Sequence, residues 1–170
     1  MYRTARVNRR IVTMPRSKHS KPRKCEAHDL PECVCGALRM VTRAVTQIYD
    51  DAMRPSGLRV TQFSLLSRIE RLQPVSAAHL VDALHADQTT LARALKVLEK
   101  DGLVRRAPRG DQRVKPVELT AKGAKRLAYA RGLWAEAQAR MVGLVGPEDW
   151  RAMRARLGGM LEAVAPPRVG

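Results

Sequence analysis

The stretch from Asp87 to Thr120 constrains the fold more than any other part of the chain. The first half has an apolar helical face at core-facing spacing, formed by Leu91, Ala94, Leu95 and Leu98. The opposite face carries hydroxyl and basic side chains, at Thr89, Arg93, Lys96 and Lys100. Such groups bind base edges and phosphates in a DNA major groove, although the solvated face of an ordinary surface helix has a similar pattern.

A glycine stop and two strand patterns follow this helix. Gly102 stands where a left-handed residue ends a helix, and the leucine after it completes a Schellman-type stop. Val104–Ala107 and Val114–Leu119 have strand composition, and the segment between them contains the turn residues Arg-Gly-Asp. Because Pro116 lacks an N–H group, we expect the second strand at the edge of its sheet. The pattern predicts a helix followed by a β-hairpin.

Three further helices are expected before Gly102. The first should begin near Pro31, and its apolar residues recur at heptad-like spacing, at Val34, Leu38, Val41, Val45 and Ile48. The second is expected to open with Thr61 as its N-cap. Ser76 is expected to cap the short third helix, and Asp87 the fourth.

Two helices are expected after the hairpin. Thr120 is placed to cap a long helix that reaches about Val145, and a last helix runs to about Val164. The last helix has one apolar stripe, at Trp150, Met153, Leu157, Met160, Leu161 and Val164. Since one-sided apolar helices lie towards both ends of the chain, we expect them to pack against a second copy in a two-fold dimer.

Charge points to a polyanionic partner. The chain has 32 Lys and Arg against 16 Asp and Glu, a net charge of +16 over 170 residues, which suits nucleic acid or an acidic membrane surface. No apolar run approaches the roughly 20 residues needed to cross a bilayer. A signal-peptide core is also missing, so we expect a cytoplasmic protein that does not use a membrane.

These patterns divide the chain into three parts. Residues 1–29 are basic and lack apolar periodicity, so we expect a disordered tail. Residues 58–119 should form the DNA-binding unit, and residues 30–54 with 120–165 a helical dimerisation region. The expected fold is mainly α with a small β-hairpin wing: a winged helix-turn-helix domain flanked by N- and C-terminal dimerisation helices.

With its flanking helices, the chain resembles the multiple-antibiotic-resistance regulator (MarR) family of transcription factors. The resemblance covers roughly residues 33 to 165 and rests on four motifs, at residues 58–63, 98–106, 111–113 and 119–123. The most specific is the Asp-x-Arg of the wing followed by Leu-Thr-x-x-Gly. The resemblance implies a homodimer on an inverted-repeat operator in double-stranded DNA, with half-sites roughly 10 bp apart.

The same resemblance assigns roles in DNA binding. Arg113 matches the minor-groove arginine of the family, and Asp111 the acid that supports it. Gln88, Thr89 and Thr90 are expected nearest base edges because they open the recognition helix. The full predicted set is Gln88, Thr89, Thr90, Arg93, Lys96, Arg109 and Arg113, with Asp111 in support.

Cys35 is a candidate redox sensor. It lies in register with the reactive cysteine of some MarR-family members, and Tyr49 matches a tyrosine partner of that cysteine. Arg39 and Val60 replace tyrosines expected there. Cys33 lies close to Cys35, but residues i and i+2 of a helix point apart, which disfavours a disulfide between them.

Two other interpretations of the cysteines stay open. Cys25, His28, Cys33 and Cys35 could supply soft or borderline metal ligands, although their spacing matches no standard zinc motif. Alternatively, Cys35 is buried in the dimer seam and the other two cysteines are incidental. We expect neither a cofactor nor a structural disulfide.

We interpret the chain as a sequence-specific transcriptional regulator, a homodimeric repressor released by a small-molecule effector or by thiol oxidation. Met40, Arg43 and Phe63 are proposed to line the effector pocket. No enzyme motif is apparent, and a thiol enzyme using Cys35 would need a nearby base. The alternative is a protein that coats DNA without sequence preference, driven by the net positive charge.

Overall fold

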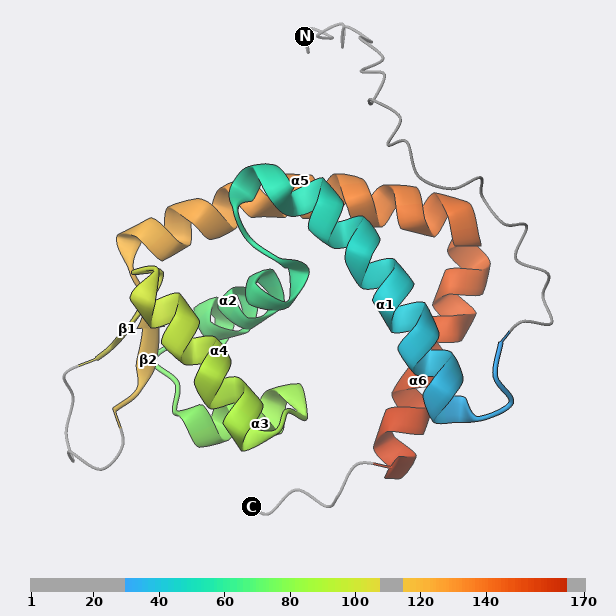
Figure 1. Ribbon diagram of the computed structural model, residues 1–170, viewed down its shortest axis with the longest axis horizontal. Helices are drawn as coiled ribbons and strands as arrows, with labels where there is room; N and C mark the ends of the chain where they lie inside the picture. Colours follow the sequence, from blue (N-terminus) through green and yellow to red (C-terminus); the bar gives the residue numbers. More distant parts are fainter. Residues whose placement is uncertain (1–29, 108–114, 165–170) are drawn as a thin grey trace, which may run out of the picture.

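The computed structural model describes residues 30–107 and 115–164. Its elements are α1 (Val34–Met53), the 3-10 turn η1 (Arg54–Ser56), α2 (Val60–Leu72), α3 (Ala77–Leu84), α4 (Gln88–Lys100), β1 (Val104–Arg106), β2 (Val117–Leu119), α5 (Ala121–Val145) and α6 (Pro147–Val164). Figure 1 shows α2, α3, α4 and the two strands gathered at one end of α5, with α6 leaving its other end. The described fold is a winged helix-turn-helix flanked by long helices, as the sequence predicts.

The core lies where α2, α3, α4 and the hairpin meet the end of α1 and the start of α5. Its largest fully buried side chains are aliphatic: Met53, Leu66, Ile69, Leu80, Leu95, Leu98, Leu103, Val117 and Leu127. Leu91 is also buried and Ala94 is half-buried, so the predicted core face of α4 is confirmed. Phe63 stacks on Trp134 with ring centroids 5.7 Å apart, which ties α2 to α5.

Three predicted N-caps are present. The Ser76 hydroxyl accepts the His79 N–H at 3.1 Å, and the Asp87 carboxylate accepts the Thr90 N–H at 2.9 Å. Thr120 caps α5 by accepting the Gly123 N–H at 3.0 Å. Each cap satisfies a helix-terminal N–H that has no partner within the helix.

Two predicted helix starts are wrong. α1 begins at Val34 and not near Pro31. α2 begins at Val60, with Arg59 and not Thr61 as its N-cap. Two contacts hold the earlier start of α2: the Gln62 side chain accepts the Arg59 N–H at 2.9 Å, and the Asp50 carboxylate of α1 accepts the Val60 N–H at 2.7 Å.

The end of α4 is a Schellman motif. Gly102 has a φ of 69°, and its N–H donates to the Glu99 carbonyl at 3.0 Å. The Leu103 N–H donates to the Leu98 carbonyl at 2.9 Å. Only glycine adopts this left-handed conformation without strain, so the predicted glycine stop is confirmed.

The hairpin is a two-stranded antiparallel sheet with Val104 opposite Leu119, so its second strand lies at an edge as expected, but a single bridge covers part of that edge. Val117 pairs with β1 on one side and with Val75 on the other, through bonds of 2.7 and 3.1 Å. Pro116 lies just before β2, and its carbonyl accepts the Ala107 N–H at 2.8 Å. Because Pro116 lies outside the strand, its missing N–H removes no bond from the ladder.

Two rows of apolar side chains remain exposed, one on α1 and one on α6. The row on α1 includes Val34, Leu38, Val41 and Ile48, and the row on α6 includes Met153, Leu157, Met160, Leu161 and Val164. Val45 is half-buried, and α6 contains no buried residue. Within residues 30–107 and 115–164, no helix is both long and apolar enough to span a bilayer.

Candidate DNA-binding interface

The turn between α3 and α4 is tight. His85 adopts a left-handed conformation with a φ of 48°, and its N–H donates to the Asp82 carbonyl at 3.4 Å. The Ala86 N–H donates to the Val81 carbonyl at 3.1 Å. The Thr90 N–H bond to the carboxylate lowers the pKa of Asp87, because the hydrogen bond favours the charged form. A charged cap therefore holds the first turn of α4.

The predicted reading face of α4 is exposed. Gln88, Thr89, Thr90, Arg93 and Lys96 all lie on the solvent side, opposite the buried leucines. The three polar residues form the first turn, and the two cations follow on the next turns. The predicted wing residues Arg109, Asp111 and Arg113 lie outside the described residues.

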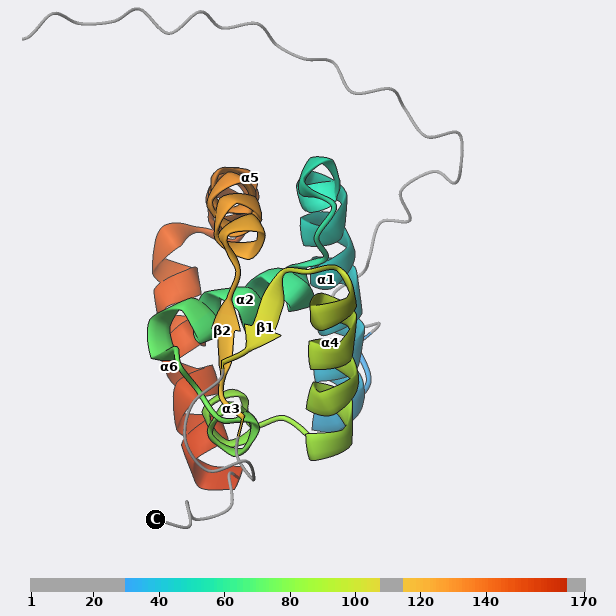
Figure 2. The same cartoon turned by 90° about the vertical axis from the view of Figure 1, so that its left-hand side faces the viewer.

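The base of the hairpin is held by contacts that the sequence did not predict. Figure 2, viewed from the hairpin side, shows β1 between β2 and α4. Arg106 of β1 pairs with Glu99 of α4 at 2.6 Å, and Arg105 pairs across the strands with Glu118 at 2.7 Å. The Gln73 side chain accepts the Leu119 N–H at 2.8 Å. Opposite charges at matched strand positions were the only available signal, and they identify the second pair alone.

The Leu-Thr-x-x-Gly motif joins the wing to α5. A Cβ at Gly123 would lie 1.9 Å from the Leu103 carbonyl oxygen, so only glycine allows this approach. The Thr120 hydroxyl donates to the Gly102 carbonyl at 2.7 Å, and the Lys122 ammonium donates to the Asp101 carbonyl at 2.7 Å. The end of α4 is thereby fixed to the start of α5.

Comparison with known proteins places this architecture in a family. Residues 58–115 match the model of the MarR family. The crystal structure of the transcriptional regulator MosR from Mycobacterium tuberculosis, in complex with DNA, is 41% identical with a TM-score of 0.67. That likeness covers 79% of this chain and 100% of the MosR chain. The chain belongs to the MarR family.

Curated relatives of this MarR-family protein are also helix-turn-helix regulators. It is 30% identical to the regulator PecS of Dickeya dadantii over 97 residues, which is 55% of this chain and 58% of PecS. It is 29% identical to the uncharacterized regulator YwoH of Bacillus subtilis over 84 residues, 49% of this chain and 61% of YwoH. The match thus spans about 60% of the length of these two proteins. Both relatives are described as transcriptional regulators of the helix-turn-helix type.

The two described cysteines are free and exposed. Cys33 is the N-cap of α1 with extended backbone angles, φ −67° and ψ 116°, and Cys35 is the second residue of the helix. The premise that both lie on a helix is therefore wrong, because α1 starts later than expected. Within one chain, Cys35 is not buried as the alternative interpretation required, and its burial against a second copy stays a prediction.

Within one chain, Tyr49 of α1 is bonded to a residue of α5. Its hydroxyl donates to the Gln138 side chain at 2.6 Å, and burial raises the pKa of this phenol. Tyr49 and Cys35 are 14 residues apart on α1, or about 21 Å along the helix axis. The two side chains therefore do not meet within one chain.

The proposed metal ligands are not assembled in the part of the chain that the structure describes. No group of three or more potential ligands occurs in residues 30–107 and 115–164. Cys25 and His28 lie outside those ranges.

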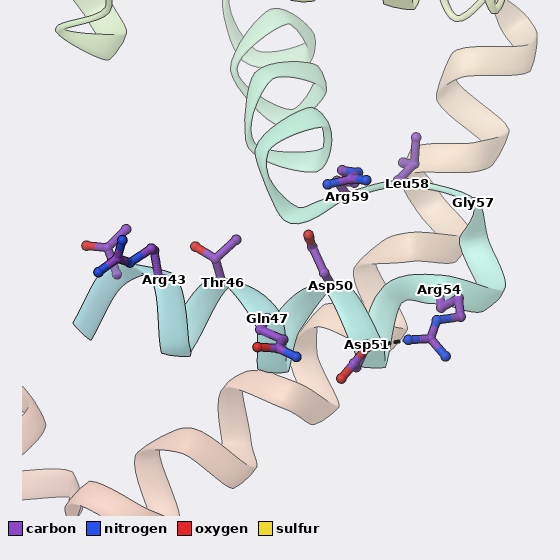
Figure 3. Close-up of a pocket in the computed structure, with 10 residues that line it drawn as sticks. Arg43, Thr46, Gln47, Asp50, Asp51, Arg54, Gly57, Leu58 and Arg59 are labelled. Carbon is purple, nitrogen blue, oxygen red and sulfur yellow. Dashed lines mark hydrogen bonds and ion pairs between the residues drawn. The ribbon is translucent and has the colours of Figure 1, made fainter. Parts of the chain in front are cut away.

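A polar hollow of about 590 Å³ lies between the second half of α1 and the start of α2 (Figure 3). Its lining residues are mostly polar or charged: Thr42, Arg43, Thr46, Gln47, Asp50, Asp51, Arg54, Gly57, Leu58 and Arg59. Asp51 pairs with Arg54, and Asp50 points towards the start of α2. The hollow thus lies beside the contact that connects α1 to α2.

The three predicted effector residues are not brought together. Arg43 lines the polar hollow, whereas Phe63 lines a separate one between α2 and α5 together with Trp134. Met40 is exposed and lines neither of these two hollows. Arg43 also borders a third hollow with Cys35 and Met160.

Proposed function

We propose that this MarR-family protein is a sequence-specific DNA-binding transcriptional regulator that acts as a homodimeric repressor. The observation that carries the proposal is the exposed face of α4. Hydroxyl, amide and basic groups project from one side of a helix whose other side is buried and whose two ends are capped. The geometry suits insertion into a major groove, with Gln88, Thr89 and Thr90 at base edges and Arg93 and Lys96 at phosphates.

A second copy of the chain is the proposed occupant of the exposed apolar rows on α1 and α6. These rows lie on the helices outside the winged part, and covering them removes apolar surface from water. Residues 58–119 then form the DNA-binding unit, and residues 30–54 with 120–165 the dimerisation region. A two-fold dimer would present two copies of α4 to an inverted repeat.

The proposed release mechanism changes the relation between these two regions. The polar hollow at Arg43 and Asp50 is the candidate effector site, because it lies where α1 holds the start of α2. A small molecule that binds one dimer shape more tightly than the other would shift the spacing of the two α4 helices. Oxidation of Cys33 or Cys35 at the exposed start of α1 is the second candidate signal.

A footprint on the DNA upstream of the protein's own gene, with excess random competitor, tests the proposed function. We expect a discrete protected inverted repeat with reduced protein, and loss of protection after oxidation if the cysteines act as sensors. Uniform coverage that disappears with competitor or salt would instead favour DNA coating without sequence preference.

A further inference from the structure

Arg106 is the one side chain in the described hairpin that connects the wing to the recognition helix by an ion pair. Its Nε donates to the Glu99 carboxylate of α4 at 2.6 Å, and its Nη1 lies 3.4 Å from the Lys115 carbonyl on the far arm. A guanidinium is planar and carries donors in a fixed fork, so one group can hold both partners in a set geometry.

The position of this contact matters because β1 and β2 are only three residues long. Arg106 is the last residue of β1, opposite Val117. The next described link between the arms is the Ala107 N–H bond to the Pro116 carbonyl. The Glu99–Arg106 pair therefore lies at the outer end of the short ladder. A contact at this end fixes the direction in which the hairpin leaves α4.

We propose that Glu99 and Arg106 are positioning residues for DNA recognition. Their ion pair sets the angle at which the wing leaves α4, and thus whether the helix and the wing reach adjacent grooves of one duplex. This inference rests on the proposed DNA-binding function. Glu99 has no direct role at DNA here, and its carboxylate acts through Arg106.

The partial exposure of the Glu99–Arg106 pair favours a role in positioning the wing over a role in folding stability. The side chains of Arg106 and Glu99 are 40% and 31% exposed, and ion pairs in such surroundings contribute little to folding. The Arg105–Glu118 pair provides a matched comparison, since it has the same chemistry in the same hairpin but connects β1 only to β2.

The test is whether Glu99→Gln weakens or strengthens DNA binding. Removing a carboxylate near a polyanion strengthens binding to any DNA if only charge matters. The positioning role predicts the opposite for the duplex protected in the footprint, with affinity falling about tenfold, while affinity for a scrambled duplex stays equal or rises. The thermal midpoint should remain within a few degrees of the wild type.

Two controls complete the experiment. Glu118→Gln makes the same charge change but leaves the contact with α4 intact, so it should keep the preference for the protected duplex. In a double-mutant cycle, Arg106→Gln should cost much less discrimination when Glu99→Gln is already present. Full discrimination in Glu99→Gln, or additive effects in the cycle, would overturn the inference. A wild-type protein with no preference for either duplex would instead contradict the proposed function.

Discussion

At the scale of single residues, the reading face of α4 divides into two kinds of expected contact. Gln88, Thr89 and Thr90 lie in the first turn, where side chains of a recognition helix reach base edges. Arg93 and Lys96 have the charge and reach of phosphate ligands, which set affinity and position but carry no sequence information. Substitutions in the first group should therefore change the sequence preference, whereas substitutions in the second should change the affinity for all sequences.

Lys96→Ala should weaken binding to all DNA sequences by a similar factor. Loss of one phosphate contact lowers the slope of log affinity against log salt concentration by about 1. Fluorescence anisotropy over a salt series on the protected and scrambled duplexes measures both effects. Lys125→Ala, an exposed lysine of α5, is the control with an unchanged slope. A loss confined to the protected duplex would assign Lys96 to base recognition instead.

Asp87 makes the stability of the winged unit depend on pH. Because the folded pKa of this carboxyl is lowered, its contribution is present above the unfolded value of about 3.9 and is lost as pH falls through the folded value. Asp87→Asn keeps a capping oxygen that does not titrate. We expect the wild type to lose stability relative to Asp87→Asn below about pH 4, measured by urea unfolding. A difference that is independent of pH would contradict a charged cap.

At the scale of elements, local signals predicted most of the fold. The caps at Ser76, Asp87 and Thr120 and the stop at Gly102 act on backbone groups within a few residues, so their partners can be read from the sequence. The exposed face of α4 follows for the same reason, because the helical period places its polar residues opposite the leucines.

Contacts between distant residues could not be read in this way. Val75 pairs with Val117 across 42 positions, and Asp50 accepts the Val60 N–H from another helix. The sequence therefore predicted neither the bridge on the outer side of β2 nor the start of α2. The Glu99–Arg106 pair depends on the angle between a helix and a strand. Effector residues were harder still, because no local pattern shows which hollows form between helices.

Gly123→Ala should test the junction between the wing and α5. The added Cβ would overlap the Leu103 carbonyl, so the backbone must move, and we expect the free energy of unfolding to fall by about 2–4 kcal/mol. Gly132→Ala on the same helix has nothing within 4 Å of its added Cβ and should raise stability by up to about 1 kcal/mol. Equal changes in the free energy of unfolding for the two variants, measured by chemical denaturation, would show that Gly123 does not pack tightly against the Leu103 carbonyl.

At the scale of the whole molecule, the exposed apolar rows decide how the winged unit is presented to DNA. No side chain of α6 is fully buried within the described chain, so covering its apolar row would take a second surface. In a two-fold dimer, the same contact would cover the apolar rows of both copies. The dimer is therefore proposed as a condition for reading two half-sites.

Leu157→Glu should dissociate this dimer. A carboxylate placed in an apolar interface has no partner there, and we expect the dimer dissociation constant to rise roughly 100-fold or more. Sedimentation equilibrium measures the change, with Tyr129→Glu, an exposed residue of α5, as the control that stays dimeric. A monomeric wild type, or a Leu157→Glu variant as dimeric as the wild type, would contradict the proposed interface.

The central claim is that α4 reads a specific DNA sequence, and selection from a pool of random duplexes tests it most directly. The reduced wild-type protein should enrich an inverted repeat with half-site centres roughly 10 bp apart, and a Thr89→Ala variant should relax the preference inside each half-site. A pool that stays random after repeated rounds, despite tight salt-sensitive binding, would contradict the claim and leave only charge-driven association with DNA.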